Sequence, residues 1–183
     1  MSPKKPTSNQ VRIIGGQWRR RILHFPDVSG LRPTPDRVRE TVFNWLGQRL
    51  DGLRCLDLFA GSGALGFEAA SRGARAVVMV ERDRAAMAAL KKNREMLGAT
   101  QVELVPADGL RWLAGGDDRF DLIFLDPPFS ADLLPAALAG AATRLAPEGK
   151  IYAEFGARPD LDGWQVLREG RAGLSHFCLL EPA

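Results

Sequence analysis

Apolar positions follow two different periodicities along most of the chain. Runs of consecutive apolar residues, typical of strands buried on both faces of a parallel sheet, occur at 53–59, 75–80, 102–105, 120–125 and 150–155. Segments with the apolar spacing of helices lie between them, at 64–72, 84–97, 110–114 and 133–145. Strands that alternate with helices predict an α/β fold, with a parallel sheet and helices on both of its faces.

The two ends of the chain depart from this alternation. Strand-like runs near 164–168 and 174–180 have no helix between them, and they predict an antiparallel hairpin at one edge of the sheet. Near the start, runs at 11–14 and 17–23 flank Gly15-Gly16, which predicts a second β-hairpin. A proline-rich linker then leads to a helix over 35–49, for which Thr34 is the expected cap.

These patterns divide the chain into two parts. Residues 1–34 form an N-terminal arm and hairpin, which we expect to be disordered over its first ten residues, and residues 35–183 form one α/β domain. Residues 1–39 carry nine Lys or Arg and two acids, whereas the remainder carries 16 basic and 20 acidic residues. A basic arm on a mildly acidic body favours contact with a polyanion, and a solubilising tail is the alternative.

Composition excludes several classes of protein. With 45% hydrophobic and 26% charged residues, the chain is typical of a soluble globular protein, and no apolar run approaches the roughly 20 residues of a membrane helix. Its polar first residues lack the apolar stretch of a signal peptide. Cys55 and Cys178 lie in separate apolar runs, so we expect them buried and reduced in a cytoplasmic protein. Two histidines and two cysteines without ligand spacing predict no metal site.

A glycine-rich loop, DLFAGSGALG at 57–66, follows the first strand of the α/β domain and opens a helix. Gly61 and Gly63 allow a ligand to approach the backbone, and the helix N-terminus offers free N–H groups. Glu81 ends the next strand, 20 residues after Gly61, where it can reach the ribose hydroxyls of a nucleoside cofactor. The same spacing is found in NAD sites, and a tight turn without a ligand is the purely structural interpretation.

Two further acids favour S-adenosylmethionine over NAD. Asp57 ends the first strand, four residues before Gly61, where a carboxylate repels a pyrophosphate but attracts an ammonium or sulfonium group. Asp108 follows the third strand, where it can accept a hydrogen bond from an adenine amine or simply cap the next helix.

The tetrapeptide Asp126-Pro127-Pro128-Phe129 ends the fourth strand at the same edge. Its prolines hold an extended backbone and remove two N–H donors, which leaves the Asp126 carboxylate and the Pro127 carbonyl as acceptors beside the Phe129 ring. Such a group can hold a planar base by its NH₂ and aim the nitrogen at an electrophile. A proline-rich turn without a catalytic role is the competing interpretation.

Together these motifs resemble the class I, Rossmann-like S-adenosylmethionine methyltransferases that act on amino nitrogens. The segments RIIGGQWRRR at 12–21 and LRPTPDRVRETVFNWL at 31–46 are more specific, and they resemble the bacterial RsmD family of 16S rRNA (guanine(966)-N2)-methyltransferases. The resemblance runs from about residue 12 to the C-terminus. It implies a seven-stranded, mostly parallel sheet whose last strand is antiparallel.

The resemblance also implies a role for each motif. Glu81 would bind the ribose, Asp108 the adenine amine, and Gly61 and Gly63 the methionine side of the cofactor. Asp126 and the Pro127 carbonyl would hold the guanine N2, with Phe129 stacked on the base. Contacts to the RNA are expected from the arm and linker, at Arg12, Trp18, Arg19, Arg20, Arg21 and Arg32.

Three further classes of protein share some of these motifs. Adenine-N6 DNA methyltransferases share the logic of the tetrapeptide, but 183 residues leave little room for the target-recognition domain they usually carry. An NAD-dependent oxidoreductase and a non-catalytic RNA-binding module on a methyltransferase fold stay open as well. The expected partner is 16S rRNA in the small ribosomal subunit or a late assembly intermediate, and we expect a monomer without membrane contact.

Overall fold

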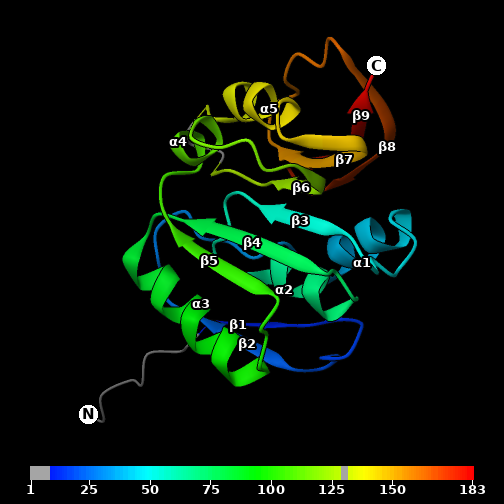
Figure 1. Cartoon of the computed structure of the whole chain (residues 1–183). Helices are drawn as coiled ribbons and strands as arrows, with labels where there is room; N and C mark the ends of the chain where they lie inside the picture. The colour runs from blue at the N-terminus through cyan, green and yellow to red at the C-terminus, as the bar shows by residue number, and fades with distance from the viewer. Residues whose placement is uncertain (1–8, 129–131) are drawn as a thin grey trace.

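A twisted, mostly parallel sheet forms the centre of the computed structural model, which describes residues 9–128 and 132–183 (Figure 1). Within these residues, seven strands are arranged in the order β5-β4-β3-β6-β7-β9-β8. Strands β5, β4, β3, β6 and β7 are parallel, and β9 is antiparallel to both of its neighbours. The predicted α/β fold with an antiparallel C-terminal hairpin is confirmed. The strands are β3 (Arg54–Asp57), β4 (Ala76–Glu81), β5 (Val102–Pro106), β6 (Phe120–Leu125), β7 (Leu145–Phe155), β8 (Trp164–Ala172) and β9 (Ser175–Pro182).

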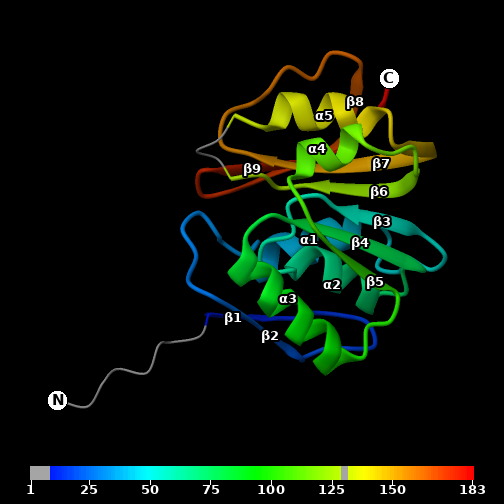
Figure 2. The ribbon, with the colours of Figure 1, turned by 60° about the vertical axis from the view of Figure 1, so that its left-hand side comes forward.

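Helices cover both faces of the sheet (Figures 1 and 2). One face carries α1 (Asp36–Trp45), α2 (Ala64–Ser71) and α3 (Arg84–Leu97), and the other carries α4 (Gly109–Ala114) and α5 (Leu134–Ala142). Successive strand residues alternate between the two cores, so that Val77 packs toward α2 and Val78 toward the opposite layer. None of the helices in the described ranges is long and apolar enough to cross a membrane.

Both cysteines are buried and unpaired, as the sequence predicts. Burial raises the pKa of Cys55 to about 12 and that of Cys178 to about 11. At neutral pH both groups are therefore thiols that pack as small apolar side chains.

The N-terminal hairpin consists of β1 (Asn9–Arg12) and β2 (Ile22–Phe25), with Arg12 paired to Ile22. A hairpin is confirmed, but the predicted Gly-Gly turn is wrong, because residues 13–21 form a long loop. Gly16, at φ 77°, lies so close to the Ser71 carbonyl that a Cβ would be 1.9 Å from its oxygen. The loop therefore runs over the end of α2 instead of turning back at once, and Arg19, Arg20 and Arg21 lie in this loop and not in the strand-like run predicted over 17–23.

Helix α1 is shorter than the predicted 35–49. It ends at Trp45, ahead of Gly47 and Gln48, which both have positive φ. Thr34 does not cap it, because the residue preceding the helix is Pro35 and no side chain caps the first turn. The Thr34 hydroxyl instead donates to Oδ2 of Asp126 at 3.1 Å. The sequence predicts disorder over the first ten residues, but Asn9 and Gln10 begin β1, and residues 1–8 lie outside the described ranges.

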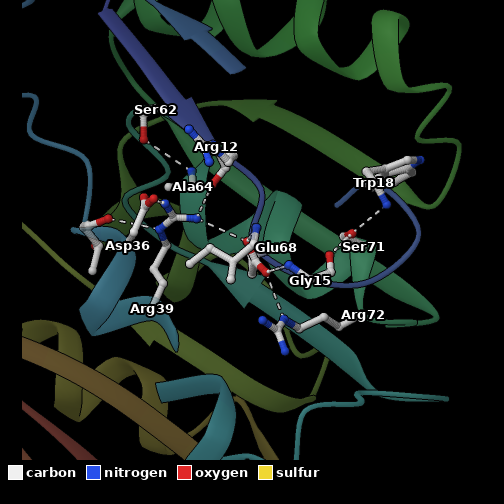
Figure 3. A network of polar contacts seen from close by, with 12 residues as sticks. Arg12, Gly15, Trp18, Asp36, Arg39, Ser62, Ala64, Glu68, Ser71 and Arg72 are labelled. Atoms are coloured by element: carbon white, nitrogen blue, oxygen red, sulfur yellow. Dashed lines mark hydrogen bonds and ion pairs between the residues drawn. The ribbon is translucent and has the colours of Figure 1, made fainter. Parts of the chain in front are cut away.

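A buried network of charges fastens the hairpin loop to the domain (Figure 3). Glu68 in α2 is fully buried, and its carboxylate accepts from the backbone N–H groups of Ile14 and Gly15 at 2.9 and 2.8 Å. The same carboxylate pairs with Arg72 at 2.9 Å and with Arg39 of α1 at 3.2 Å. Glu68 therefore joins the hairpin loop, α1 and α2 at one point.

Replacing Glu68 should lower the free energy of unfolding more than the same replacement of an exposed glutamate. The Glu68→Ala variant leaves two buried arginines without their shared partner, which costs about 3–5 kcal/mol when a buried pair is broken. Denaturant titration gives the free energy of unfolding, with the exposed Glu95→Ala as the matched control. A loss for Glu68→Ala as small as that of the control would contradict this role.

Candidate active site

The predicted site acids gather at one edge of the sheet. Asp57 ends β3, Glu81 ends β4, Asp108 follows β5 and Asp126 follows β6. Because parallel strands point the same way, the loops after them meet at the edge where ligands bind in open α/β sheets. The order β4-β3-β6 places the switch in strand order beside β3, which carries the glycine loop. The linker between β2 and α1 lies at the same end of the molecule (Figure 2).

Glu81 shapes the glycine loop. Its Oε2 accepts from the Gly61 N–H at 2.7 Å, and its Oε1 accepts from the Asp83 N–H at 2.9 Å. Gly63 has a φ of 83°, and a Cβ there would lie 2.6 Å from Phe67, so this glycine is needed for packing. Gly61 has a φ of 54° and open space around its Cβ position, where the nearest atom is 3.8 Å away. The open side of the loop is therefore at Gly61.

Asp57 lies buried beneath this loop, 2% exposed. Its Oδ2 accepts from the Gly66 N–H in the first turn of α2 at 3.0 Å. Burial raises the pKa of Asp57 to about 7, and the nearby charge of Glu81 adds to the effect, against the hydrogen bond from Gly66. Near neutral pH a small change in its surroundings therefore decides whether Asp57 is charged.

Asp108 caps helix α4. Its Oδ1 accepts from the Arg111 N–H at 3.1 Å, which is the capping role that the sequence left open. The side chain is half-buried at the end of β5. Binding of an adenine amine by this residue stays a prediction.

Asp126 lies at the end of β6, half-buried, with Pro127 buried behind it. Burial raises the pKa of Asp126 well above its ordinary value, and the charges of Glu154 and Asp57 raise it further, while the hydrogen bond from Thr34 lowers it. Phe129 lies outside the described residues. Asp126 and Pro127 therefore lie at the edge that the glycine loop occupies, and their use as a pair of acceptors stays a prediction.

Sequence reasoning missed two residues beside Asp126. The sequence pattern indicates Thr34 only as a cap of α1, and it indicates no role for Glu154 in β7. Glu154 is 7% exposed and lies next to Asp126, because β7 pairs with β6 in the register Leu125↔Ala153. A lone acid in the apolar run of 150–155 is the signal that could have drawn attention to it.

The predicted RNA-binding residues are divided between two ends of the molecule. Arg32 belongs to the linker, whose Leu31 lies beside Gly61, and it is exposed at the active-site edge. Arg21 is exposed at the other end, where it donates to the Met96 carbonyl near the end of α3. Arg19 and Arg20 share that loop, which binds the last residue of α2 through the Gln17 N–H, and Arg12 is exposed at the end of β1.

The structure contradicts the RNA contact predicted for Trp18. It is only 8% exposed and packs in the core with the hairpin, α1 and α2, and its backbone N–H donates to Ser71 Oγ at 3.0 Å. The sequence predicts that Trp18 contacts RNA beside three arginines, but the indole is instead the apolar anchor of the loop.

Comparison with known proteins agrees with this arrangement. The family model described as "Conserved hypothetical protein 95" matches residues 11–181. Ribosomal RNA small subunit methyltransferase D of Escherichia coli K12 is 44% identical, over 97% of this chain and 94% of its own. The Haemophilus influenzae protein of the same name is 40% identical, over 94% of both chains. The chain belongs to the RsmD family.

Solved structures support the assignment to the RsmD family. The Escherichia coli methyltransferase YhhF superposes with a TM-score of 0.85 at 42% identity, covering 95% of this chain and 98% of its own. The Thermus thermophilus 16S rRNA N2 G1207 methyltransferase RsmC, in complex with AdoMet and guanosine, gives a TM-score of 0.73 at 26% identity. That match covers 96% of this chain and 50% of RsmC.

S-adenosylmethionine is the cofactor of this RsmD-family enzyme, and the site fits it. The glycine loop is open at Gly61, and it is bound by the carboxylates of Glu81 and Asp57, so the edge offers acceptors and negative charge to a cationic nucleoside. A diphosphate would meet the same two carboxylates unfavourably.

Cofactor affinity should rise with pH across neutrality. We expect Asp57 to attract the ammonium group of the cofactor, and this attraction would be lost below a pKa of about 7, where Asp57 is protonated. Calorimetry with S-adenosylhomocysteine should show affinity about tenfold higher on the alkaline side, since a hydrogen bond to a charged group contributes about 1.5–3 kcal/mol. Asp57→Asn should flatten this dependence, and an unchanged pH profile in that variant would remove Asp57 from the binding site.

The same shift has the opposite sign for the stability of the free protein. The folded pKa of Asp57, about 7, lies above the ordinary value of 3.8, so the folded state binds the proton more tightly. The contribution of Asp57 to stability is therefore present at low pH and is lost as the pH rises through 7.

Proposed function

We propose that this enzyme transfers the methyl group of S-adenosylmethionine to the exocyclic N2 of one guanine in 16S rRNA. The proposal rests on the position of Asp126 and Pro127, which lie at the same sheet edge as the Gly61 loop and can act as a pair of acceptors. The relatives support the substrate, since they are ribosomal RNA small subunit methyltransferases. The N2 position is supported by the RsmC structure, which holds guanosine and AdoMet together.

The cofactor supplies an electrophilic methyl group on a sulfonium. We assign its ribose to Glu81, its adenine amine to Asp108, and its methionine side to Asp57, Gly61 and Gly63. Asp126 and the Pro127 carbonyl accept the two N–H groups of N2, which fixes the nitrogen toward the methyl group and draws its lone pair out of conjugation. Phe129 stacks on the flipped base.

The RNA is held by arginines at two places. Arg32 binds phosphates beside the target base, as does Arg12, which lies near Ser62 of the glycine loop (Figure 3), whereas Arg19, Arg20 and Arg21 bind phosphates remote from it. None of these five arginines takes part in an ion pair within the part of the chain that the structure describes. Their charges are therefore available to a polyanion.

The substrate is 16S rRNA within the small ribosomal subunit or a late assembly intermediate, and the enzyme acts as a monomer in the cytoplasm. The test offers labelled S-adenosylmethionine with unmodified small subunits, with naked 16S rRNA and with duplex DNA, and then maps the labelled base. Label at guanine N2 of the rRNA is the expected result. Label in DNA or at adenine N6 would overturn the proposal.

Asp126→Ala should lose most turnover while cofactor affinity is kept. A group that orients the nucleophile and stabilises the transition state contributes about 10²–10³-fold. Asp126→Asn should retain part of the rate, because its amide oxygen still accepts one N–H. Single-turnover methylation and calorimetry measure the two effects, and wild-type rates for Asp126→Ala would exclude a catalytic role.

Replacing Arg19, Arg20 and Arg21 together by Gln should weaken RNA binding and flatten its salt dependence. Each phosphate contact contributes about 0.7–0.9 to the slope of log affinity against log salt. Substitution is preferable to deleting the arm, because five hairpin residues (Val11, Ile13, Trp18, Leu23 and Phe25) belong to the core. Binding is measured over a salt titration.

The matched control replaces three exposed cations away from the active-site edge, Arg75, Lys91 and Arg119, none of which is in an ion pair among the described residues. An equal change of slope in both triple variants would mean that only net charge matters. Cofactor affinity should be unchanged in both.

A further inference from the structure

Asp126 belongs to a buried polar cluster that extends to the neighbouring strands. Glu154 of β7 accepts from the Tyr152 hydroxyl at 3.0 Å and from the Ser175 hydroxyl at 2.7 Å. Thr34 Oγ1 lies 3.1 Å from Asp126 Oδ2 and 3.5 Å from Glu154 Oε2. Two carboxyl groups from adjacent strands thus share one hydroxyl group.

This cluster contains more acceptors than hydrogens. The Thr34 hydroxyl has one hydrogen, which at any moment is donated to Asp126 or to Glu154. In the described ranges, neither carboxyl group takes part in an ion pair. The negative charges of the two groups therefore repel in a setting of low dielectric constant, and a proton placed on one of them relieves the repulsion.

We propose that Glu154, acting through Thr34, is a positioning residue that makes the Asp126 carboxylate the proton acceptor for the target amine. The inference rests on the proposed function, because it names the destination of the proton that N2 releases.

The transfer step balances with the groups present. The N2 lone pair forms the bond to the methyl carbon while the carbon–sulfur bond breaks, and sulfur keeps that electron pair. N2 then carries one proton too many, and this proton passes to an Asp126 carboxylate oxygen. The neutral carboxylic acid no longer repels Glu154, so the neighbouring charge favours the product side of the proton transfer.

The surroundings hold the two partners in place. The Arg39 Nε–H donates to the Thr34 carbonyl at 3.0 Å, which fixes the residue beside both carboxyl groups. Burial and the charges of Glu154 and Asp126 raise the pKa of Tyr152 well above its ordinary value, so Tyr152 remains a neutral donor to Glu154. The titratable groups facing Asp126 are thus Glu154 and Tyr152 from β7 and Asp57 from β3.

Two isosteric variants should move the titration of Asp126 in opposite directions. Glu154→Gln removes a negative neighbour and should lower the pKa of Asp126, whereas Thr34→Val removes a donor to its charged form and should raise it. In single-turnover methylation of unmodified small subunits, the acid limb of the pH–rate profile should shift down by about 1 pH unit for Glu154→Gln. It should shift up for Thr34→Val.

The exposed Glu103→Gln is the matched control and should leave the profile unchanged. Thr34→Ser should restore the wild-type limb. Glu154→Gln should also be slower on its plateau, because a weaker base accepts the proton less readily. Limbs that do not move, or that move in the same direction in both variants, would overturn the inference, since a purely structural defect lowers the rate without these opposite shifts.

A second measurement does not depend on activity. Carbon-13 spectra of labelled aspartate carboxyl groups, with Asp126 identified by its missing signal in Asp126→Asn, give its titration midpoint directly. Should the wild type methylate no guanine, the proposed function and the assigned proton acceptor fail, even if the midpoints shift as expected. Should it methylate guanine N2 while the midpoints coincide in wild type and variants, only the inference fails. Thermal unfolding checks the fold, and Thr34→Val carries the test if Glu154→Gln does not fold.

Discussion

The arrangement of the active site depends on the hydrogen bonds and ion pairs made by the fully buried carboxylate of Glu68. It receives two backbone N–H groups of the hairpin loop and the guanidinium groups of Arg39 and Arg72. Arg39 in turn donates to the carbonyls of Arg12 and Thr34 and pairs with Asp36. A charge inside the protein is tolerable only when it is paired and hydrogen-bonded in this way. Arg39, held by Glu68, therefore fixes the linker, and with it the position of Thr34 beside Asp126.

The active-site edge gathers four acids that take part in no ion pair among the described residues. Adjacent strands and the residues just after them supply these acids, which are Asp57, Glu81, Asp126 and Glu154. Burial of a carboxylate at a ligand site raises the free energy of its charged form when no opposite charge is near. A sulfonium cofactor supplies the missing positive charge, and that charge disappears when the methyl group leaves. The electrostatic attraction is thus greatest for the reactive form of the cofactor, which favours the release of the product.

The sequence was sufficient for the elements whose pattern is local. Unbroken apolar runs predicted β4 and β6, and Gly98 marked the end of α3 at Leu97 correctly. The glycine loop and its acids followed from the rule that parallel strands end at one edge. Pairings over long separations could not be predicted, such as Ile14 with Glu68 or Thr34 with Glu154, which are 54 and 120 residues apart. The burial of Trp18 escaped prediction for the same reason, because it depends on α2.

The hairpin loop (residues 13–21) carries Arg19, Arg20 and Arg21, and its position bears on the kind of RNA that this enzyme would recognise. The carbonyl that binds Arg21 belongs to Met96, at the end of a 14-residue helix that starts just after Glu81. At 1.5 Å per residue, the loop lies about 20 Å from the cofactor edge. A phosphate bound there and a base held at Asp126 are separated by several base-pair steps of a duplex. A short oligonucleotide around the target guanine would not reach this loop. An RNA folded so that a second segment crosses the far end of the domain reaches both sites, which favours an assembled particle over an isolated strand.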